Sequence, residues 1–365
     1  MATFRVDSPR ERFDERDTMF ARMARRPGTP AYDDFYARRP ELEKPDSRIR
    51  SSPPLLQPGG RHYDPAISAE AGRHFDEIGH IVPDVSLVSE WRTRLEASND
   101  PTETVREMLL CLGAVAAGVS QLDQAYVYTH KGRWDEGYGK QISLDHPFVV
   151  VFLVEMDHAA MSRAPRAETL RESAWQYLRA ARIAFTLEAT LRACGHAAKA
   201  HYDAHYDLIL PPLAVLAGLG ELGRHNILIA DRYGSRVRIG AVSTDLPLRP
   251  GRPASRGADR FCQICKKCAS NCPSHALALD GKVDVRGVRK WPTNVERCHS
   301  FWRSVGTDCG ICMAVCPFAH PNNAFHNLVR WIVRTLPWAA RLMLFFDDLV
   351  YGREWKGRTA RETEL

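Results

Sequence analysis

The sequence lacks any long hydrophobic run. Its longest uninterrupted apolar stretch covers residues 148–154, which is far shorter than the about 20 residues of a membrane-spanning helix. The amino terminus has no apolar region of the kind that a secretory signal needs. Arg25-Arg26 is followed by Pro27-Gly28-Thr29-Pro30, so the pair does not read as a twin-arginine export signal. These absences favour a cytoplasmic protein without a transmembrane segment.

Neither positive nor negative charge is concentrated in one part of the chain. The 365 residues carry 50 basic and 44 acidic side chains, for a net charge of +6. In the first fifty residues, eleven arginines and one lysine face ten acids. A balance of this kind does not predict a polybasic arm, and we expect no nucleic-acid partner.

The chain is long enough for two or more domains. Residues 1–62 are polar and proline-rich, which predicts an extended segment that wraps the core rather than folding alone. We expect a core domain over 63–255, a cysteine-rich domain over 256–325 and a docked amphipathic segment over 326–365.

Local signals indicate mixed helix and strand in the core. Asp100-Pro101-Thr102-Glu103 is a helix start, with an N-cap aspartate and proline at the first helical position. Residues 167–193 read as one long helix, which Gly195 ends. We expect strands at 126–128, 148–154, 226–230 and 237–242, the second of them buried on both faces.

Two polar side chains stand out in these elements. One face of the long helix carries mainly small apolar residues, and Tyr177 is the one large side chain with a polar end on that face. It is either a core tyrosine with a satisfied hydroxyl or a hydroxyl that points into a cavity. On the last strand, Arg236 and Arg238 face one side together with Gly240. That side is either a solvated edge or the wall of a cavity or anion site.

Two further patterns carry less information. Gly218-Leu-Gly220-Glu-Leu-Gly223 has the spacing of a dinucleotide fingerprint, but it leads into a strand rather than opening a helix. His196, His201 and His205 lie within ten residues, but their spacings fit no strong metal-site template.

Eight of the ten cysteines lie between residues 261 and 317. The first run, Cys262-x2-Cys265-x2-Cys268-x3-Cys272-Pro, has the bacterial ferredoxin spacing, in which the fourth cysteine binds a second cluster. The chain then supplies Cys298 and a second run, Cys309-x2-Cys312-x3-Cys316-Pro. We assign one 4Fe–4S cluster to Cys262, Cys265, Cys268 and Cys316, and the other to Cys272, Cys298, Cys309 and Cys312.

Zinc and disulfides are the alternatives for these cysteines. Zinc needs neither the three-cysteine run nor the Cys-Pro that ends both runs. Disulfides need an oxidising compartment, which nothing in the sequence indicates.

The remaining elements are a hairpin and a tail. Residues 277–285 read as a hairpin around Asp280-Gly281. The tail from Asn327 carries many large apolar side chains with arginines between them. It reads as a segment docked on the core, and a membrane-surface role is the alternative, although Asp347 and Asp348 interrupt the apolar pattern.

The sequence around both cysteine runs resembles the cobalamin-dependent reductive dehalogenases and, more distantly, epoxyqueuosine reductase. The matching stretches are Phe261-Cys-Gln-Ile-Cys-Lys-Lys-Cys-Ala-Ser-Asn-Cys-Pro-Ser, Cys298-His-Ser-Phe-Trp and Asp308-Cys-Gly-Ile-Cys-Met-Ala-Val-Cys-Pro-Phe. Upstream, Ala217-Gly-Leu-Gly-Glu-Leu-Gly-Arg224, Thr244-Asp-Leu-Pro-Leu248 and Tyr177 fit the same family.

This resemblance implies an α+β fold, with a nitroreductase-like α/β corrinoid-binding core and a ferredoxin-like domain that holds two 4Fe–4S clusters. It implies an oxidoreductase in which electrons pass through the clusters to base-off cobalamin and a carbon–halogen bond is replaced by carbon–hydrogen. The family's proton donor falls on Tyr177 and its basic partner on Arg238. The positions beside the cofactor and substrate fall on His205, where many relatives have asparagine, and on Tyr206.

Asp203-Ala-His205 begins the Asp-x-His-x-x-Gly motif of proteins that place a histidine on cobalt, but Leu208 stands at the glycine position. We therefore expect base-off binding. We also expect a small halogenated substrate and a soluble electron donor of the ferredoxin or flavodoxin type. The rival functions are a tRNA-modifying reductase of the epoxyqueuosine type and a non-enzymatic electron carrier.

Overall fold

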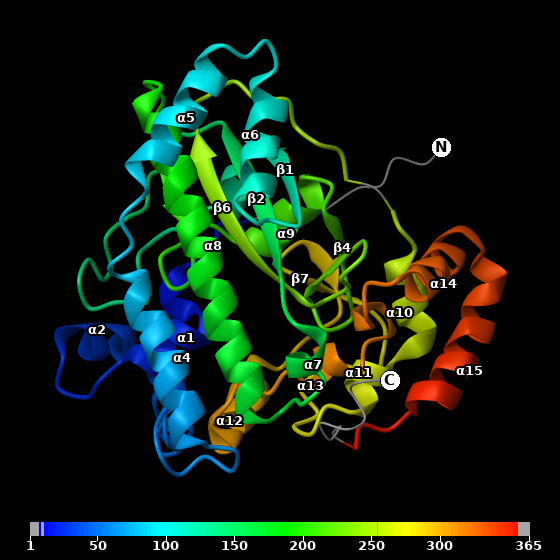
Figure 1. Ribbon diagram of the computed structural model, residues 1–365. Coiled ribbons are helices and arrows are strands. Elements are labelled where there is room, and N and C mark those ends of the chain that lie inside the picture. Colours follow the sequence, from blue (N-terminus) through cyan, green and yellow to red (C-terminus); the bar gives the residue numbers. More distant parts are fainter. Residues whose placement is uncertain (1–6, 9–10, 254, 357–365) are drawn as a thin grey trace.

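The computed structural model describes residues 7–8, 11–253 and 255–356 (Figure 1). The helices and strands up to the last strand of the core are η1 (Glu15–Asp17), α1 (Met19–Ala24), α2 (Pro30–Arg38), α3 (Pro40–Arg50), α4 (Pro65–Ile78), α5 (Val85–Glu96), α6 (Pro101–Cys111), β1 (Ala116–Gln121), η2 (Gln124–Tyr126), β2 (Phe148–Glu155), α7 (His158–Met161), α8 (Ala167–Ala193), β3 (Ala198–His201), α9 (Leu210–Leu216), β4 (Gly220–Leu222), β5 (Leu228–Ala230) and β6 (Val237–Thr244). The elements that follow are α10 (Ala258–Cys265), α11 (Lys267–Ser270), β7 (Val283–Val285), β8 (Val288–Lys290), α12 (Val295–Val305), α13 (Ile311–Ala314), η3 (Pro317–Ala319), α14 (Ala324–Thr335), η4 (Pro337–Ala339) and α15 (Ala340–Tyr351).

The core is built on a four-stranded antiparallel sheet with the strand order β1-β2-β6-β3. The central strand β2 pairs with both β1 and β6, so that Val151 stands between Gly118 and Ala241. Six consecutive residues of β2 are buried, which confirms the prediction of a strand covered on both faces.

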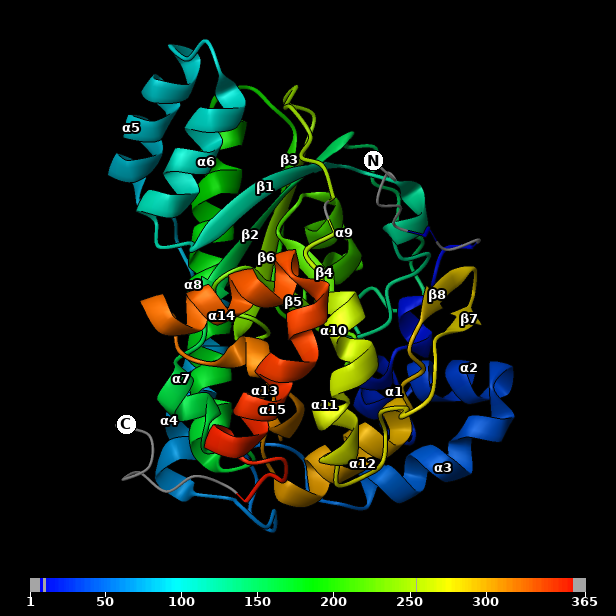
Figure 2. The ribbon, with the colours of Figure 1, turned by 90° about the vertical axis from the view of Figure 1, so that its right-hand side faces the viewer.

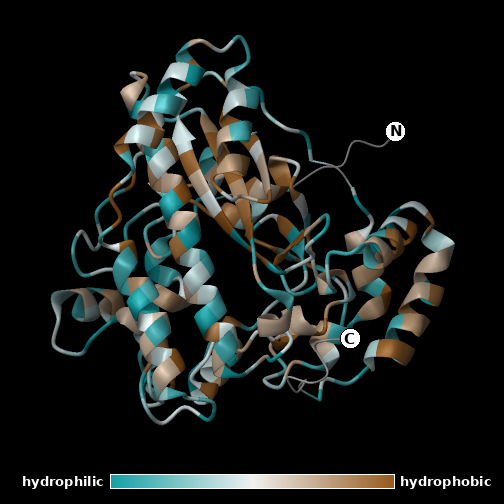
Figure 3. Cartoon of the chain, viewed as in Figure 1, coloured by the Kyte–Doolittle hydropathy of each residue, from teal (hydrophilic) through white to brown (hydrophobic). Residues whose placement is uncertain are grey.

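Helices cover the two faces of this sheet. Val150, Phe152 and Val154 point toward α8, with α5 and α6 in the same hydrophobic cluster. The alternate residues Val149 and Val151 point toward α9 on the opposite face. Figure 1 shows α8 running along one side of the sheet, and Figure 3 shows the sheet as the most hydrophobic part of the chain. The period of two along β2 therefore divides the core into two layers.

The amino-terminal segment differs from the extended conformation that the sequence predicts. Thr18 and Thr29 cap helices α1 and α2 by accepting bonds from Ala21 and Tyr32, and Pro30 opens α2 at a position where proline favours a helix. These helices are short, and α1 is fixed by Arg22, which binds Asp46 of α3 and, at 2.8 Å, Glu296 of α12. The segment therefore folds as short helices, and Arg22 of α1 ties it to α12.

Two predicted β elements are wrong. Residues 126–128 are not a strand, because Asp123 caps the short helix η2 at Ala125 and only Val127 forms an isolated bridge, to Leu208. The hairpin after the first cysteine run turns at Arg286-Gly287 rather than at Asp280-Gly281. Both residues of that turn have positive φ, at 59° and 88°, as a two-residue hairpin turn of the primed type requires.

The cysteine-rich segment packs directly against the core. Gly234 approaches Phe318 so closely that a Cβ added to Gly234 would lie 2.1 Å from the Phe318 carbonyl oxygen. Arg236 spans the same boundary, because its Nε donates to the Ala319 carbonyl at 2.6 Å and its Nη1 to the Met156 carbonyl. The two parts of the chain are thus joined by backbone contacts next to strand β6.

After the cysteines, α14 and α15 form a helical pair beside α10 (Figure 2). Val333 and Ala340 enter the same hydrophobic cluster as Cys262, Cys265 and Cys316. None of the helices in the described ranges is both long and apolar enough to cross a membrane.

Candidate active site and cluster ligands

The eight predicted ligand cysteines fall into two groups. In the first group, Cys262 and Cys265 lie on α10, Cys268 on α11 and Cys316 just before η3. Lys266 joins the two helices with a left-handed φ of 59°, which turns the chain sharply between the second and third cysteines. The pKa of Cys265 is raised to about 12 by burial and by the nearby thiols of Cys262 and Cys268. Cys262, Cys265 and Cys316 share one hydrophobic cluster.

The second predicted group is Cys272, Cys298, Cys309 and Cys312. The pKa of Cys309 is raised to about 12 by burial and by the neighbouring thiols of Cys298 and Cys272. Burial also raises the pKa of Cys312, and Cys309 and Cys268 add to that shift. A bound metal centre would remove these tightly held protons, because metal coordination deprotonates a thiol. Cys268 packs in the same hydrophobic cluster as Cys272, Cys309 and Cys312, so the division of the eight cysteines between two clusters stays a prediction.

A tyrosine and an arginine meet at the boundary between α8 and β6. The guanidinium carbon of Arg238 lies 4.6 Å from the centroid of the Tyr177 ring. Burial raises the pKa of Tyr177 well above its ordinary value, and Arg238 opposes that rise. Burial lowers the pKa of Arg238, but Tyr177 and Asp308 outweigh it, and the net shift is upward. The phenol and the guanidinium are therefore held next to each other, with the cation over the ring.

Three other residues hold Arg238 in this position. Its Nη2 donates to Ser173 Oγ at 2.5 Å and to Asp308 Oδ2 at 2.7 Å. The other carboxylate oxygen of Asp308 accepts from Trp302 Nε1 at 3.1 Å. Asp308 directly precedes Cys309 in the chain. The arginine on the core strand is thus bonded to the loop that carries a predicted cluster ligand.

Not all of the polar groups at this site are satisfied within the protein. The Nε of Arg238 is buried and has no hydrogen-bond partner among the described residues. Nearby, burial raises the pKa of Asp203, while Arg133 and Arg238 lower it. An unpaired buried donor beside a phenol and a carboxyl group is costly without a partner. This arrangement is suited to a bound polar or anionic group.

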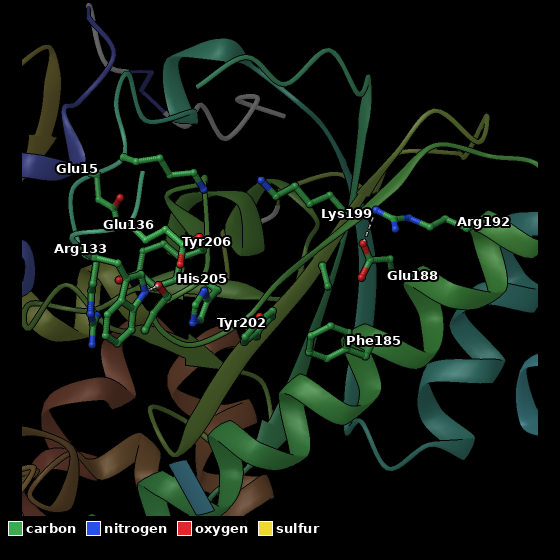
Figure 4. Close-up of a pocket in the computed structure, with 14 residues that line it drawn as sticks. Glu15, Arg133, Glu136, Phe185, Glu188, Arg192, Lys199, Tyr202, His205 and Tyr206 are labelled. Carbon is green, nitrogen blue, oxygen red and sulfur yellow. Dashed lines mark hydrogen bonds and ion pairs between the residues drawn. The ribbon is translucent and has the colours of Figure 1, made fainter. Parts of the chain in front are cut away.

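A pocket of about 330 Å³ lies next to this cluster (Figure 4). Its lining includes the predicted His205 and Tyr206, and also Tyr202 and Phe185. Tyr177 packs in one hydrophobic cluster with Tyr202 and Phe185. The tyrosine therefore lies behind one wall of the pocket, while its neighbours form that wall.

The ring of His205 is solvent-exposed but stacked on both sides. The Trp134 ring lies 5.4 Å from it at an interplanar angle of 22°, and the Tyr202 ring lies 5.1 Å from it at 28°. Partial burial lowers the pKa of His205, and Asp203 opposes that change. His205 is therefore held as one of three aromatic rings along the pocket wall.

The loop over 131–136 completes the pocket and is fixed by the amino-terminal segment. The amide of Gly132 donates to Glu15 Oε2 at 2.7 Å, and the buried Arg25 donates to the Gly132 carbonyl at 2.6 Å. Lys131 of this loop and Lys199 of β3 both bind the carboxylate of Asp207. The pocket thus combines aromatic walls with basic side chains and with the acidic side chains of Glu15, Glu136 and Glu188.

Arg236 does not belong to the site, although it was expected on the same polar face as Arg238. It is 1% exposed, binds Glu155 at 3.1 Å and donates to backbone carbonyls on both sides of the domain boundary. Its role is structural.

Sequence reasoning missed Asp308, Ser173, Trp302, Asp203, Arg133 and Trp134. Asp308 and Trp302 stood in motifs that were recognised for their cysteines, which is the signal that could have indicated them. Trp134 lies in a loop whose placement depends on a distant segment, and nothing local predicts its contact with His205.

Known proteins share the cysteine-rich segment and the fold of this chain. Residues 261–320 match the family described as 4Fe-4S dicluster domain, which confirms the prediction of a domain for two 4Fe–4S clusters. The chain is 29% identical over 289 residues to a tetrachloroethene reductive dehalogenase of Desulfitobacterium hafniense, covering 66% of this chain and 52% of that protein. It is 31% identical over 224 residues to that of Sulfurospirillum multivorans, covering 58% of this chain and 44% of that protein.

A solved catabolic reductive dehalogenase in complex with 3-bromo-4-hydroxybenzoic acid superposes with a TM-score of 0.75 at 23% identity. The match covers 96% of this chain and 49% of that one. Over a shorter stretch of 120 residues, the chain is 30% identical to an epoxyqueuosine reductase of Lactococcus garvieae, covering 31% of this chain and 33% of that protein. These findings confirm the fold and the resemblance, and the chain spans about half the length of the reductive dehalogenases it matches.

Proposed function

We propose that this chain is a corrinoid-dependent reductive dehalogenase that replaces a carbon–halogen bond of a small organic molecule by a carbon–hydrogen bond. The reaction consumes two electrons and one proton: the carbon–halogen bond breaks, the halogen leaves as halide and the proton forms the new carbon–hydrogen bond. The relatives named for tetrachloroethene and the solved enzyme with a brominated hydroxybenzoate support this class of substrate.

The observation that carries the proposal is the contact between Tyr177, Arg238 and Asp308. One guanidinium covers the phenol and binds the carboxylate next to Cys309. A proton donor is thereby fixed beside the loop that carries ligands of an electron-transfer cluster. An enzyme that must deliver electrons and a proton to one substrate needs this proximity, whereas a simple electron carrier does not.

The residues present fit the two kinds of cofactor. Two sets of four thiols match the requirement of two 4Fe–4S clusters, Cys262, Cys265, Cys268 and Cys316 holding one and Cys272, Cys298, Cys309 and Cys312 the other. His205, Tyr206 and Trp134 offer flat aromatic surfaces to a corrin, and Lys131 and Lys199 offer donors to its amides and phosphate. The bound corrinoid supplies the electron pair that cleaves the carbon–halogen bond.

The chain's own residues supply the proton. Burial raises the pKa of Tyr177 and keeps its hydroxyl protonated at neutral pH. Once two electrons have been delivered to the carbon–halogen bond and the halogen has left as halide, the carbon keeps an electron pair and is a stronger base than phenolate, so the hydroxyl can donate to it. Arg238 then stabilises the phenolate, because a cation beside the ring favours the charged form.

We further propose a cytoplasmic enzyme that receives electrons from a soluble donor of the ferredoxin or flavodoxin type. Cys111 and Cys194, the two cysteines not assigned to a cluster, are not joined by a disulfide, which supports the location because thiols persist in a reducing compartment.

Halide release tests the proposed reaction. Protein reconstituted anaerobically with iron, sulfide and hydroxocobalamin is reduced with titanium(III) citrate and given tetrachloroethene or 3-bromo-4-hydroxybenzoic acid. We expect halide and the dehalogenated product from at least one of them, and none from protein that lacks the corrinoid. The proposal would be contradicted if protein loaded with both iron and corrinoid released no halide from either substrate and instead reduced an epoxyqueuosine-containing RNA stem loop.

A further inference from the structure

The outward face of α14, η4 and α15 carries many large apolar side chains. They include Trp338 of η4, which is 75% exposed, and Leu349 of α15, which is 71% exposed. The full set is Phe325, Leu328, Trp331, Trp338, Leu342, Phe345, Phe346, Leu349 and Val350. Figure 1 places α15 at the outer edge of the molecule, and Figure 2 shows both helices together on one side. A contiguous patch of this kind marks an interaction surface.

Acidic side chains do not interrupt this face, contrary to the expectation from the sequence. Asp347 turns inward, where its carboxylate binds Lys267 Nζ at 2.5 Å and His320 Nε2 at 2.6 Å. Asp348 binds Lys267 at 3.2 Å and Arg353 at 2.9 Å. Lys267 itself is 3% exposed. The two acids therefore fasten α15 to the dicluster domain and leave the outer face free of negative charge.

The charges that remain around the face are mostly basic. Arg341 is the one exposed charged residue of α14 and α15, both of which lie wholly within the described part of the chain. Directly after α15, Arg353 and Lys356 are exposed together with the acid Glu354, and Arg260 is exposed on α10, which contacts α15. An apolar face of tryptophan, phenylalanine and leucine with a basic rim is complementary to anionic lipid headgroups over an acyl boundary.

We propose that α14 and α15 lie in the plane of an anionic lipid surface, with this apolar face inserted at the boundary between headgroups and acyl chains. Tryptophan suits that depth, because its ring is apolar and its N–H meets the headgroups. Docking there turns the end of the protein that holds Cys262 and Cys265 toward the lipid, since α15 packs against α10. This inference does not depend on the proposed dehalogenation and needs no corrinoid to test.

Vesicle flotation tests the proposal with the full-length, cluster-loaded protein. The probes are vesicles of phosphatidylcholine alone and vesicles that also contain phosphatidylglycerol. We expect the protein to float with the anionic vesicles and more weakly with the neutral ones. The double variant Phe345→Asp/Leu349→Asp should lower the binding constant at least about tenfold, because each buried side chain of this size contributes a tenfold or larger factor. Arg341→Glu should weaken binding to anionic vesicles only.

The matched control is Val82→Asp/Val85→Asp, which places acids on two valines that are 83% and 79% exposed near α5, on another side of the molecule. It should bind vesicles like the unchanged protein. Iron content and far-UV circular dichroism check folding, and Phe345→Gln/Leu349→Gln replaces the acidic pair if that pair misfolds. Absence of flotation, or equal flotation of the Phe345/Leu349 variant, would overturn the proposal. Light scattering could instead detect a dimer that these variants abolish. That result would also overturn the proposal, because a second copy of the chain would then cover the face.

Discussion

Arg238 Nη2 lies 2.7 Å from Asp308 Oδ2, and this ion pair joins strand β6 to the loop that begins the second cysteine run. The two residues are 70 positions apart in the sequence. Their side chains are 19% and 17% exposed, so water screens the pair less than it would a surface pair. Through this contact, the position of the guanidinium over Tyr177 depends on the loop that carries Cys309.

Replacing Tyr177 by phenylalanine should lower turnover by about two to four orders of magnitude, the usual contribution of a general acid. The phenylalanine ring still fills the site beside Phe185 and Tyr202, so iron and corrinoid content should be unchanged. Single-turnover halide release with matched cofactor loading measures the effect. Near-normal turnover in Tyr177→Phe would assign the proton to another donor.

Arg238→Ala should damage turnover more than Arg238→Lys, because lysine keeps the charge but loses the planar fork that binds Ser173 and Asp308 together. Asp308→Asn should lower kcat by about tenfold with little change in KM, since the ion pair becomes a weaker hydrogen bond from the guanidinium to a neutral amide. A proportional rise in KM instead would show that Asp308 acts on substrate binding and does not position the arginine.

Arg236→Ala should destabilise the fold rather than alter the chemistry. The side chain is fully buried and donates to carbonyl groups on both sides of the domain boundary, so its loss should cost about 3 kcal/mol or more. The exposed neighbour Arg232 supplies the control, and Arg232→Ala should change the free energy of unfolding by no more than about 0.5 kcal/mol. Chemical denaturation measures both, and equal stabilities would contradict the structural role.

Cys298 is the predicted ligand that stands outside both compact runs. Cys298→Ser should lose the second cluster and reduce iron from about eight to about four atoms per chain. Cys111→Ser changes another exposed cysteine and should keep the full complement. Iron analysis and EPR of the reduced protein distinguish the two. Full iron content in Cys298→Ser would remove Cys298 from the ligand set.

His205 should not bind cobalt. Its ring is stacked between Trp134 and Tyr202, and Leu208 at the motif's glycine position is buried. The EPR spectrum of the one-electron-reduced corrinoid should therefore show no nitrogen superhyperfine splitting. Splitting that disappears in His205→Ala would show a histidine ligand.

Features with strong local signals could be predicted from the sequence. Apolar periodicity and Gly195 set the long helix, which spans Ala167–Ala193 as expected. Asp100 caps α6 through the Glu103 amide at 3.2 Å, as its position before proline indicated. The cysteine spacing predicted the 4Fe-4S dicluster domain, because ligand geometry constrains spacing tightly.

Features that depend on distant partners could not be predicted. The alternation of Arg236 and Arg238 placed them on one face, but hydrogen bonds from its side chain to the Ala319 and Met156 carbonyls make Arg236 structural. The loop near Trp134 is set by Glu15 and Arg25 from the amino-terminal segment. In the sequence, Asp347 and Asp348 interrupt the apolar pattern of the tail. Their partner Lys267 lies 80 positions upstream of Asp347, so nothing local indicates that both acids bind a buried lysine.

The central claim is that a carbon–halogen bond becomes a carbon–hydrogen bond with a proton from an exchangeable donor, Tyr177. The most direct measurement is mass spectrometry of the product formed in D₂O by corrinoid-loaded protein from 3-bromo-4-hydroxybenzoic acid or tetrachloroethene, with halide counted in parallel. We predict one halide released and one deuterium on the carbon that carried it, and strongly reduced formation of this product by Tyr177→Phe. The account would be contradicted by a product without deuterium at that carbon. It would also be contradicted if halide were released and no hydrogen isotope replaced the halogen on the carbon.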